Sequence, residues 1–222
     1  MKPLSEATIF VSIAAYRDPQ LPLTVASLFA QAEHPERVFV GVFNQIHLQD
    51  DQDCVAPDRP NLLPHLLDYN EAQGACWARG YVWNKLLGEQ DFALQIDSHS
   101  RFAPNWDTSV LQMHADIGDE QAVITHYPMG FDTETGALDA QMYTYFNVQS
   151  FRATQLPEVT SGAVDVQAAP KRCAQTAFVA AGSLFGRGAM FKPVPYDPYI
   201  YFHGEEINFA ARLWTHGYNL YL

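Results

Sequence analysis

The fold is decided by TIFVSIAAYRDPQLPLTVASLFAQAEHPERVFVGVFNQ, residues 8–45. Residues 8–16 and 37–45 are continuous apolar runs rich in β-branched and aromatic side chains, which is typical of strands buried on both faces. Between them, residues 21–35 place apolar side chains at helical spacing and end at Pro35. A strand, a helix and a strand in this order predict two parallel strands joined by a right-handed crossover, the unit of an α/β fold.

The rest of the chain continues the alternation of strands and helices. A polar, acidic stretch over 46–64 predicts a long loop. The region 129–176 has no clear periodicity, and its length is typical of a lid or a binding insertion. After it come an apolar segment over 177–191, a turn, a helix with an acidic start and a last strand. The other predicted elements are helices over 74–87 and 105–117 and strands over 92–97 and 121–128.

The composition is that of one domain with a substantial core, since 48% of the 222 residues are hydrophobic. A formal net charge of −12 argues against nucleic acid or an anionic membrane as the main partner. The three cysteines are widely spaced and odd in number, which predicts a reducing compartment rather than a disulfide framework. No segment approaches the apolar length of a membrane span, so we expect a cytoplasmic protein.

The apolar pattern of one predicted strand stops inside LQIDSHSRF, residues 94–102. Side chains two residues apart in an extended segment project to the same side, so Asp97 and His99 share one space. An oxygen and a nitrogen ligand at the carboxyl end of a parallel strand predict a site for a Mn²⁺- or Mg²⁺-class cation. The alternative interpretation is structural: Asp97 caps the next turn, and His99 forms a local hydrogen bond.

Other charged side chains stand in segments that are otherwise apolar. Glu205 and Glu206 begin a predicted helix, where the helix dipole favours carboxylates, but their aromatic lead-in, YIYFHGEE, is more apolar than an exposed cap requires. Arg79 on an apolar helix is either a salt-bridged residue or a bidentate partner for a diphosphate. Arg17 and Asp18 follow the first strand, where a nucleotide base or ribose docks in an α/β fold.

The chain resembles glycosyltransferase family 60 in the segments IFVSIAAYRDPQL, GACWARG, LQIDSHSRFAPNWD and YDPYIYFHGEEINFAARLWTHGYNLY. The similarity runs in order from about residue 8 to the end. Eukaryotic members of that family transfer N-acetylglucosamine (GlcNAc) from UDP-GlcNAc to a hydroxyproline of a cytoplasmic ubiquitin-ligase adaptor of the Skp1 type. A fainter similarity connects WAR, IDSHSR, AGSLF and FHGEEI with motifs of the polypeptide N-acetylgalactosaminyltransferases.

The resemblance implies a GT-A fold, in which a Rossmann-like, mixed and mostly parallel central sheet is flanked by helices. One domain over 1–222 would contain a nucleotide-binding half, about 1–125, and an acceptor and sugar half, about 126–222. The implied reaction is a metal-dependent, retaining transfer of a sugar, GlcNAc by preference, from a UDP-sugar to a hydroxyl of a protein or glycan. The implied site residues are Asp97 and His99 for Mn²⁺ or Mg²⁺, Ser12, Tyr16, Arg17, Asp18, Arg79, Ser98 and Gly182 for the donor, and Glu205 and Glu206 for catalysis.

The chain departs from the family at its end. Relatives commonly take a third metal ligand from a segment beyond the last strand, whereas this chain stops at YNLYL, so we expect it to be shortened at its C-terminus. Two other functions stay open. One is a non-catalytic nucleotide-sugar-binding module of the same fold, and the other is a metal-dependent hydrolase that uses Asp97, His99, His203 and Glu205. Stabilisation by UDP with Mn²⁺ indicates a transferase, whereas a hydrolase responds to the metal alone.

Overall fold

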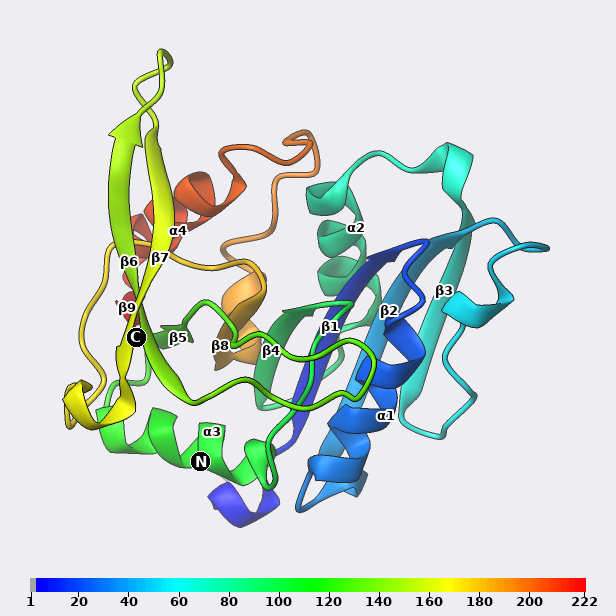
Figure 1. Cartoon of the computed structure of the whole chain (residues 1–222), viewed down its shortest axis with the longest axis horizontal. Helices are drawn as coiled ribbons and strands as arrows, with labels where there is room; N and C mark the ends of the chain where they lie inside the picture. The colour runs from blue at the N-terminus through cyan, green and yellow to red at the C-terminus, as the bar shows by residue number, and fades with distance from the viewer. Residues whose placement is uncertain (1–2) are drawn as a thin grey trace.

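The computed structural model describes residues 3–222, which form a seven-stranded sheet flanked by helices (Figure 1). The strand order is β3-β2-β1-β4-β8-β5-β9. β8 pairs antiparallel with β4 and β5, whereas the other pairings within this sheet are parallel. The predicted mixed, mostly parallel sheet is therefore confirmed. The strands are β1 Ile9–Tyr16, β2 Val38–Ile46, β3 Leu62–Asp68, β4 Phe92–Asp97, β5 Ala122–Thr125, β8 Ser183–Arg187 and β9 Asn219–Tyr221.

The opening strand, helix and strand have the predicted arrangement. β1 and β2 pair in parallel register from Ile9 opposite Val38 to Tyr16 opposite Gln45. The helix between them, α1, covers Leu21–Gln31 and has a proline in its first turn, where a missing N–H costs no helical hydrogen bond. These elements bring the segment after Tyr16 to the carboxyl edge of the sheet.

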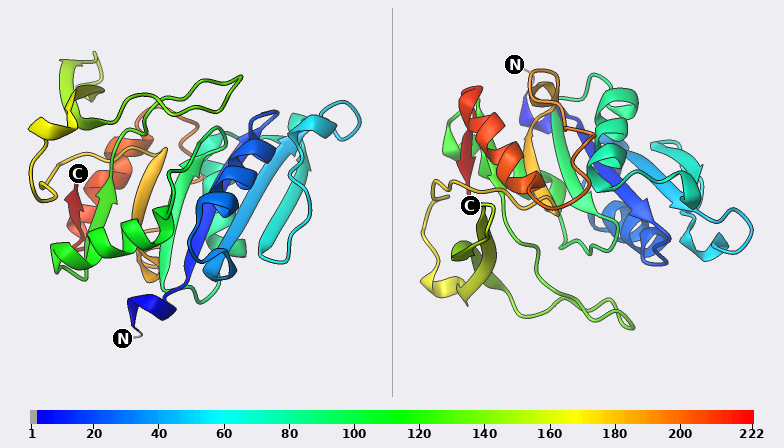
Figure 2. Two further views of the ribbon diagram at one scale, coloured as in Figure 1. Left: turned by 60° about the horizontal axis from the view of Figure 1, so that its bottom comes forward. Right: turned by 90° about the horizontal axis from the view of Figure 1, so that it is seen from above.

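Helices cover both faces of the sheet (Figure 2). Because side chains alternate along a strand, Val11 of β1 joins the core under α1 and α3, while Phe10 joins the core under α2 and α4. None of the helices within residues 3–222 is long and apolar enough to cross a membrane. The helices named here are α2 Ala75–Tyr81, α3 Trp106–Ile117 and α4 Glu205–Thr215.

Two predicted elements are wrong in part. The predicted loop over 46–64 ends in the edge strand β3, which sequence patterns missed because it contains Pro64 and leaves much of its surface exposed. The predicted helix over 74–87 is α-helical only to Tyr81 and continues as a π-helix over Val82–Leu86.

The region 129–176 contains an antiparallel hairpin rather than irregular structure throughout. β6, Met142–Phe151, pairs with β7, Pro157–Asp165, with a register shift between Val148 and Ser150. The hairpin stands as a separate two-stranded ribbon whose tip projects above the body in Figure 1. Most of its side chains are exposed or half-buried, so they show no alternating buried face by which the strands could be predicted.

Candidate active site

A cavity of about 630 Å³ opens at the carboxyl ends of β1 and β4, the sheet edge at which α/β folds bind ligands. Segments from both ends of the chain meet there. The predicted residues that line it are Tyr16, Arg17, Asp18, Arg79, Asp97, Ser98 and His99. The residues that sequence reasoning missed include Gln45, Tyr69, Gly74, Tyr201 and Phe202.

Arg17 and two aromatic rings form one wall of this cavity. Arg17 has a left-handed backbone with φ of 48°, and its Nε and Nη2 donate to the two carboxylate oxygens of Asp51 at 2.7 and 3.0 Å. The guanidinium carbon of Arg17 lies 4.7 Å from the ring centroid of Tyr69. Tyr16 meets Tyr69 edge-on with ring centroids 6.4 Å apart. This wall therefore offers π-surface to a flat ring, while Arg17 itself is held by Asp51.

Asp18 joins the first strand to the Asp-Ser-His segment. Its Oδ2 accepts hydrogen bonds from Ser98 Oγ at 2.5 Å and, with Nδ1 protonated, from His99 at 2.9 Å. Burial disfavours the charged carboxylate, but the hydrogen bonds from His99 and Ser98 outweigh burial and lower the pKa of Asp18 to about 2. Because Nδ1 of His99 is held by Asp18, Nε2 is the ring nitrogen with which His99 can bind a ligand.

Arg79 links β4 to the start of α4. It is 7% exposed, its Nη2 donates to Asp97 Oδ1 at 2.9 Å, and its Nη1 donates to Glu205. The Cys76 thiol donates to the other oxygen of Glu205 at 3.2 Å, and burial raises the pKa of that thiol, which keeps it protonated. Burial alone would lower the pKa of Arg79, but Tyr196, Glu205 and Asp97 raise it above its ordinary value. Glu205 is thus engaged by two buried donors.

A second cavity, of about 420 Å³, adjoins the first and shares Arg79 and Asp97 with it. It lies between β7 and the start of α4, and Glu206 lines it. Oε1 of Glu206 accepts a hydrogen bond from the Ala181 backbone N–H at 2.8 Å, and burial raises the pKa of Glu206. Glu206 therefore accepts one hydrogen bond from the backbone, whereas Glu205 forms an ion pair with Arg79 and accepts a hydrogen bond from the Cys76 thiol.

Gly182 lines the second cavity beside Asp97. A Cβ at position 182 would lie 2.5 Å from Asp97 Oδ2, so the backbone approaches the carboxylate as closely as it does because the residue is glycine. The structure thus places Gly182 next to Asp97, and its contact with a donor sugar stays a prediction.

Ser12 is the predicted residue that the structure keeps away from both cavities. It is fully buried inside the sheet, and its Oγ has no hydrogen-bond partner among the described residues. The first β1 residue that lines the 630 Å³ cavity is Ala14, two residues further along the strand, which is roughly 7 Å. The predicted contact of Ser12 with uridine therefore has no support from the geometry.

Asp97 and His99 line the same cavity, as the sequence predicted for a cation site. Within residues 3–222, however, no group of three or more His, Cys, Asp or Glu side chains is arranged to hold a metal ion. The four-residue centre of the alternative hydrolase, with His203 and Glu205, is therefore not assembled. A cation held by Asp97 and His99 fits only if other ligands, such as diphosphate oxygens and water, complete its coordination.

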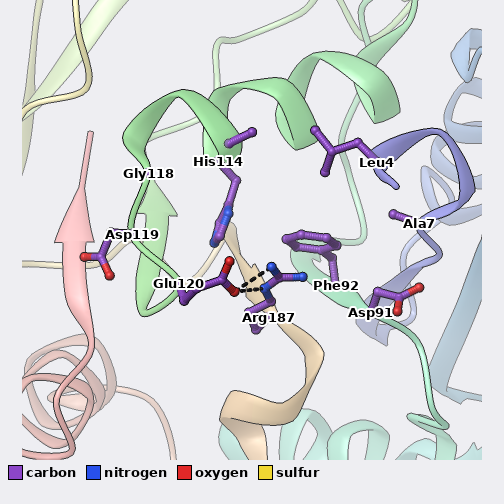
Figure 3. A pocket seen from close by; sticks show the side chains of 10 residues that line it. Leu4, Ala7, Asp91, Phe92, His114, Gly118, Asp119, Glu120 and Arg187 are labelled. Carbon is purple, nitrogen blue, oxygen red and sulfur yellow. Dashed lines mark hydrogen bonds and ion pairs between the residues drawn. The ribbon is translucent and has the colours of Figure 1, made fainter. Parts of the chain in front are cut away.

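Another pocket, of about 340 Å³, lies at the opposite edge of the sheet (Figure 3). It is lined by residues that precede β1 and β4 and by Arg187 of β8. Arg187 is paired with Glu120 at 2.6 Å and lies over the ring of Phe92, 4.4 Å from its centroid. Since these groups neutralise one another and lie far from the carboxyl strand ends, we assign the active site to the two adjoining cavities.

Comparisons with known proteins agree with this fold. The model of a family described as Glycosyltransferase (GlcNAc) matches residues 8–65 and 59–222. A search of curated proteins gives no match. The chain is similar to the crystal structure of S. aureus TarS 1–349 in complex with UDP-GlcNAc, with a TM-score of 0.58 and 11% identity over 96% of this chain and 55% of that one. It is also similar to the complex of the same TarS fragment with UDP, with a TM-score of 0.56 and 12% identity over 96% of this chain and 57% of that one. At such identities the likeness shows the fold, and the chain spans about half the length of these fragments.

Proposed function

Because the chain belongs to the GlcNAc glycosyltransferase family, we propose that it transfers GlcNAc from UDP-GlcNAc to a hydroxyl acceptor. One observation carries the proposal: a larger cavity with an aromatic wall adjoins a smaller, glycine-lined cavity, and the two share Arg79 and Asp97. A nucleotide and a sugar joined by a diphosphate have this shape. The similar TarS fragment has been crystallised with UDP-GlcNAc.

In this proposal the uracil binds at Tyr16 and Tyr69, and the ribose binds near Asp18 and Ser98. The aromatic wall and the acceptor oxygens of Asp18 support this assignment. The nucleotide then occupies mainly the predicted half over 1–125, and the sugar and the acceptor the half over 126–222. Contact of Arg79 with the diphosphate stays a prediction, because two of its guanidinium nitrogens already donate to carboxylates.

We assign Asp97 and His99 to a Mn²⁺ or Mg²⁺ ion that comes with the donor. When bound, such a cation would supply positive charge to the diphosphate leaving group. The support from the structure is that both side chains are oriented by neighbours: Arg79 holds Oδ1 of Asp97, and Asp18 holds Nδ1 of His99. Partners of this kind fix the direction in which a ligand atom points.

In the proposed reaction, the acceptor oxygen forms a bond to C1 of GlcNAc while the bond from C1 to the UDP oxygen breaks and leaves its electron pair on UDP. The resemblance implies retention of configuration. Since no side chain is identified as a nucleophile, we propose a front-face route, in which a UDP phosphate oxygen receives the acceptor proton. Both glutamates line the second cavity, and we give Glu206 the role of orienting the acceptor or the sugar hydroxyls, since only one backbone N–H engages it among the described residues. Glu205 holds Arg79 in place.

The test is release of UDP from UDP-GlcNAc, UDP-GalNAc and UDP-glucose, with Mn²⁺, Mg²⁺ or EDTA, beside thermal-shift curves with UDP. We expect Mn²⁺-dependent stabilisation by UDP and fastest turnover of UDP-GlcNAc. Stabilisation without turnover indicates the non-catalytic module, and stabilisation by metal without an effect of UDP refutes the assignment. The anomeric configuration of the first sugar product, measured by NMR, decides between retention and inversion.

A further inference from the structure

A further cavity, of about 400 Å³, lies on the face of the sheet that α3 covers. We call it the α3 groove; α3 and the segment 126–141 form its walls, and strands of the sheet form its floor. Figure 2 shows this segment extending on the same side of the sheet as α1. The floor contains Ile96 and Phe185, and the α3 side contributes Trp106 and Met113. Most of the groove is therefore built from uncharged side chains.

The groove leaves large apolar side chains open to solvent. Met113 on α3 is 43% exposed, and Leu138 on the opposite wall is 46% exposed. Apolar side chains grouped in a concave site gain free energy when a ligand covers them, at about 25 cal/mol per Å² of buried apolar surface. The groove is thus suited to an apolar group of small-molecule size.

The outer wall of the groove is an ordered turn fixed beside the Asp-Ser-His segment. Asp132 N donates to Ala137 O at 2.8 Å, and Phe131 bridges to Leu138. The guanidinium carbon of Arg101 lies 4.3 Å from the ring centroid of Phe131. Because Arg101 follows His99 by two residues, the position of this wall is set from the active site.

The groove is continuous with the proposed donor site at two residues. His99 lines both the groove and the nucleotide cavity, and Gly182 lines both the groove and the sugar cavity. The groove therefore adjoins both cavities of the proposed donor site at these two residues. The sugar cavity differs in chemistry, because its far wall carries the charged pair of Arg152 and Glu158.

We propose that the α3 groove binds the apolar part of the acceptor and directs its hydroxyl past Gly182 to C1 of the sugar. The acceptor class is a hydroxyl carried on an alkyl or aromatic group. This inference rests on the proposed transferase function. In the step, the acceptor oxygen bonds to C1, the bond between C1 and UDP breaks with its electrons on UDP, and the hydroxyl proton goes to a phosphate oxygen of UDP.

The experiment uses unbranched alcohols from ethanol to hexanol as acceptors, with UDP-GlcNAc and Mn²⁺. Mass spectrometry measures alkyl N-acetylglucosaminide, and a separate assay measures hydrolysis of UDP-GlcNAc without alcohol. We expect kcat/KM for the alkyl product to rise about fourfold per methylene, the factor that corresponds to transfer of one CH₂ from water to an apolar site.

Two variants test whether the dependence of kcat/KM on alkyl chain length arises in the α3 groove. Leu138→Glu places a charge in the groove, and Leu66→Glu places the same charge on β3, at a leucine that is 45% exposed against 46% for Leu138. We expect Leu138→Glu to flatten the dependence on chain length and Leu66→Glu to leave it intact. Hydrolysis with a flat or absent alkyl series overturns the acceptor groove, as does an equal effect of both variants. Absence of both hydrolysis and UDP binding overturns the transferase function itself.

Discussion

Glu205 and Glu206 are adjacent in sequence but have different surroundings. We therefore expect the same substitution, Glu→Gln, to lower stability at position 205 and transfer activity at position 206. Glu205 is 4% exposed and holds Arg79. Removal of one partner from a buried ion pair costs about 3–5 kcal/mol. Glutamine keeps one oxygen acceptor, and Arg79 keeps Asp97, so we expect Glu205→Gln to lie at the lower end, about 3 kcal/mol. For a domain of this size, that loss lowers Tm by roughly 6–12 °C.

Glu206→Gln has a different expected result. Glutamine keeps the Oε1 acceptor for the Ala181 N–H, and because burial raises the pKa of Glu206, loss of its charge should not destabilise the folded state at neutral pH. If Glu206 forms a charge-assisted hydrogen bond to the acceptor or the sugar, its loss costs about 1.5–3 kcal/mol, which is roughly a 10- to 150-fold decrease in kcat/KM for transfer. Affinity for UDP with Mn²⁺ should not change.

The assay for this pair is UDP release with acceptor, run beside melting curves and calorimetric titration of UDP. A stable Glu205→Gln variant with lost transfer, next to a fully active Glu206→Gln variant, would refute the reasoning and return catalysis to Glu205.

The pH dependence of stability gives an independent measurement of Glu206. Burial raises its pKa, so the folded state binds the proton more tightly than the unfolded state does. The resulting stability is present below the ordinary pKa of glutamate, about 4.3, and is lost as pH rises through the raised value. The Tm of the wild type relative to Glu206→Gln should therefore fall between acid and neutral pH. A difference in Tm that is constant with pH would contradict the buried setting.

Three further predictions concern Asp97 and its neighbours. Asp97→Ala should abolish the Mn²⁺-dependent part of UDP affinity in calorimetry while the protein still folds, and an unchanged affinity would exclude Asp97 as a ligand. Gly182→Ala places a Cβ 2.5 Å from Asp97 Oδ2, and overpacking of this size costs about 1–3 kcal/mol, so Mn²⁺-dependent UDP affinity should fall on the order of tenfold. Arg79→Lys leaves one of two carboxylates unpaired and should destabilise the unliganded protein by about 1.5–3 kcal/mol in thermal unfolding. Normal stability, with a loss of affinity for UDP that is larger than the loss for uridine, would instead indicate direct contact of Arg79 with the diphosphate.

The sheet edge could be predicted because buried parallel strands are readable as continuous apolar runs. Where the runs over 8–16 and 92–97 stop, the next polar side chains must lie at the carboxyl edge. The structure brings Asp18, Ser98 and His99 into hydrogen-bonding contact there. Ser12 lies inside its run, which explains why the structure buries it in the sheet and does not place it at this edge.

The roles of Glu205 and Glu206 could not be separated from sequence. Successive residues on a helix point about 100° apart, and the face that each occupies depends on a partner elsewhere in the chain. The partner of Glu205 is Arg79, which lies 126 residues away in sequence. Tyr69 was missed in a related way, because it follows β3, an edge strand that lacks a continuous apolar run.

Partners that are distant in sequence also explain why the Asp-Ser-His segment could be recognised from sequence, while the orientation of its side chains could not. In the proposed cation site Asp97 and His99 would supply the ligand atoms, but their orientation comes from residues on other elements: Arg79 of α2 holds Oδ1 of Asp97, and Asp18 after β1 holds Nδ1 of His99. Gly182, just before β8, leaves space next to Oδ2. Arg79 and Asp18 each fix one atom of the side chain that they hold, and contacts of this kind preorganise a binding site. Loss of Arg79 or Asp18 should therefore weaken binding of the UDP-sugar even where Asp97 and His99 both remain.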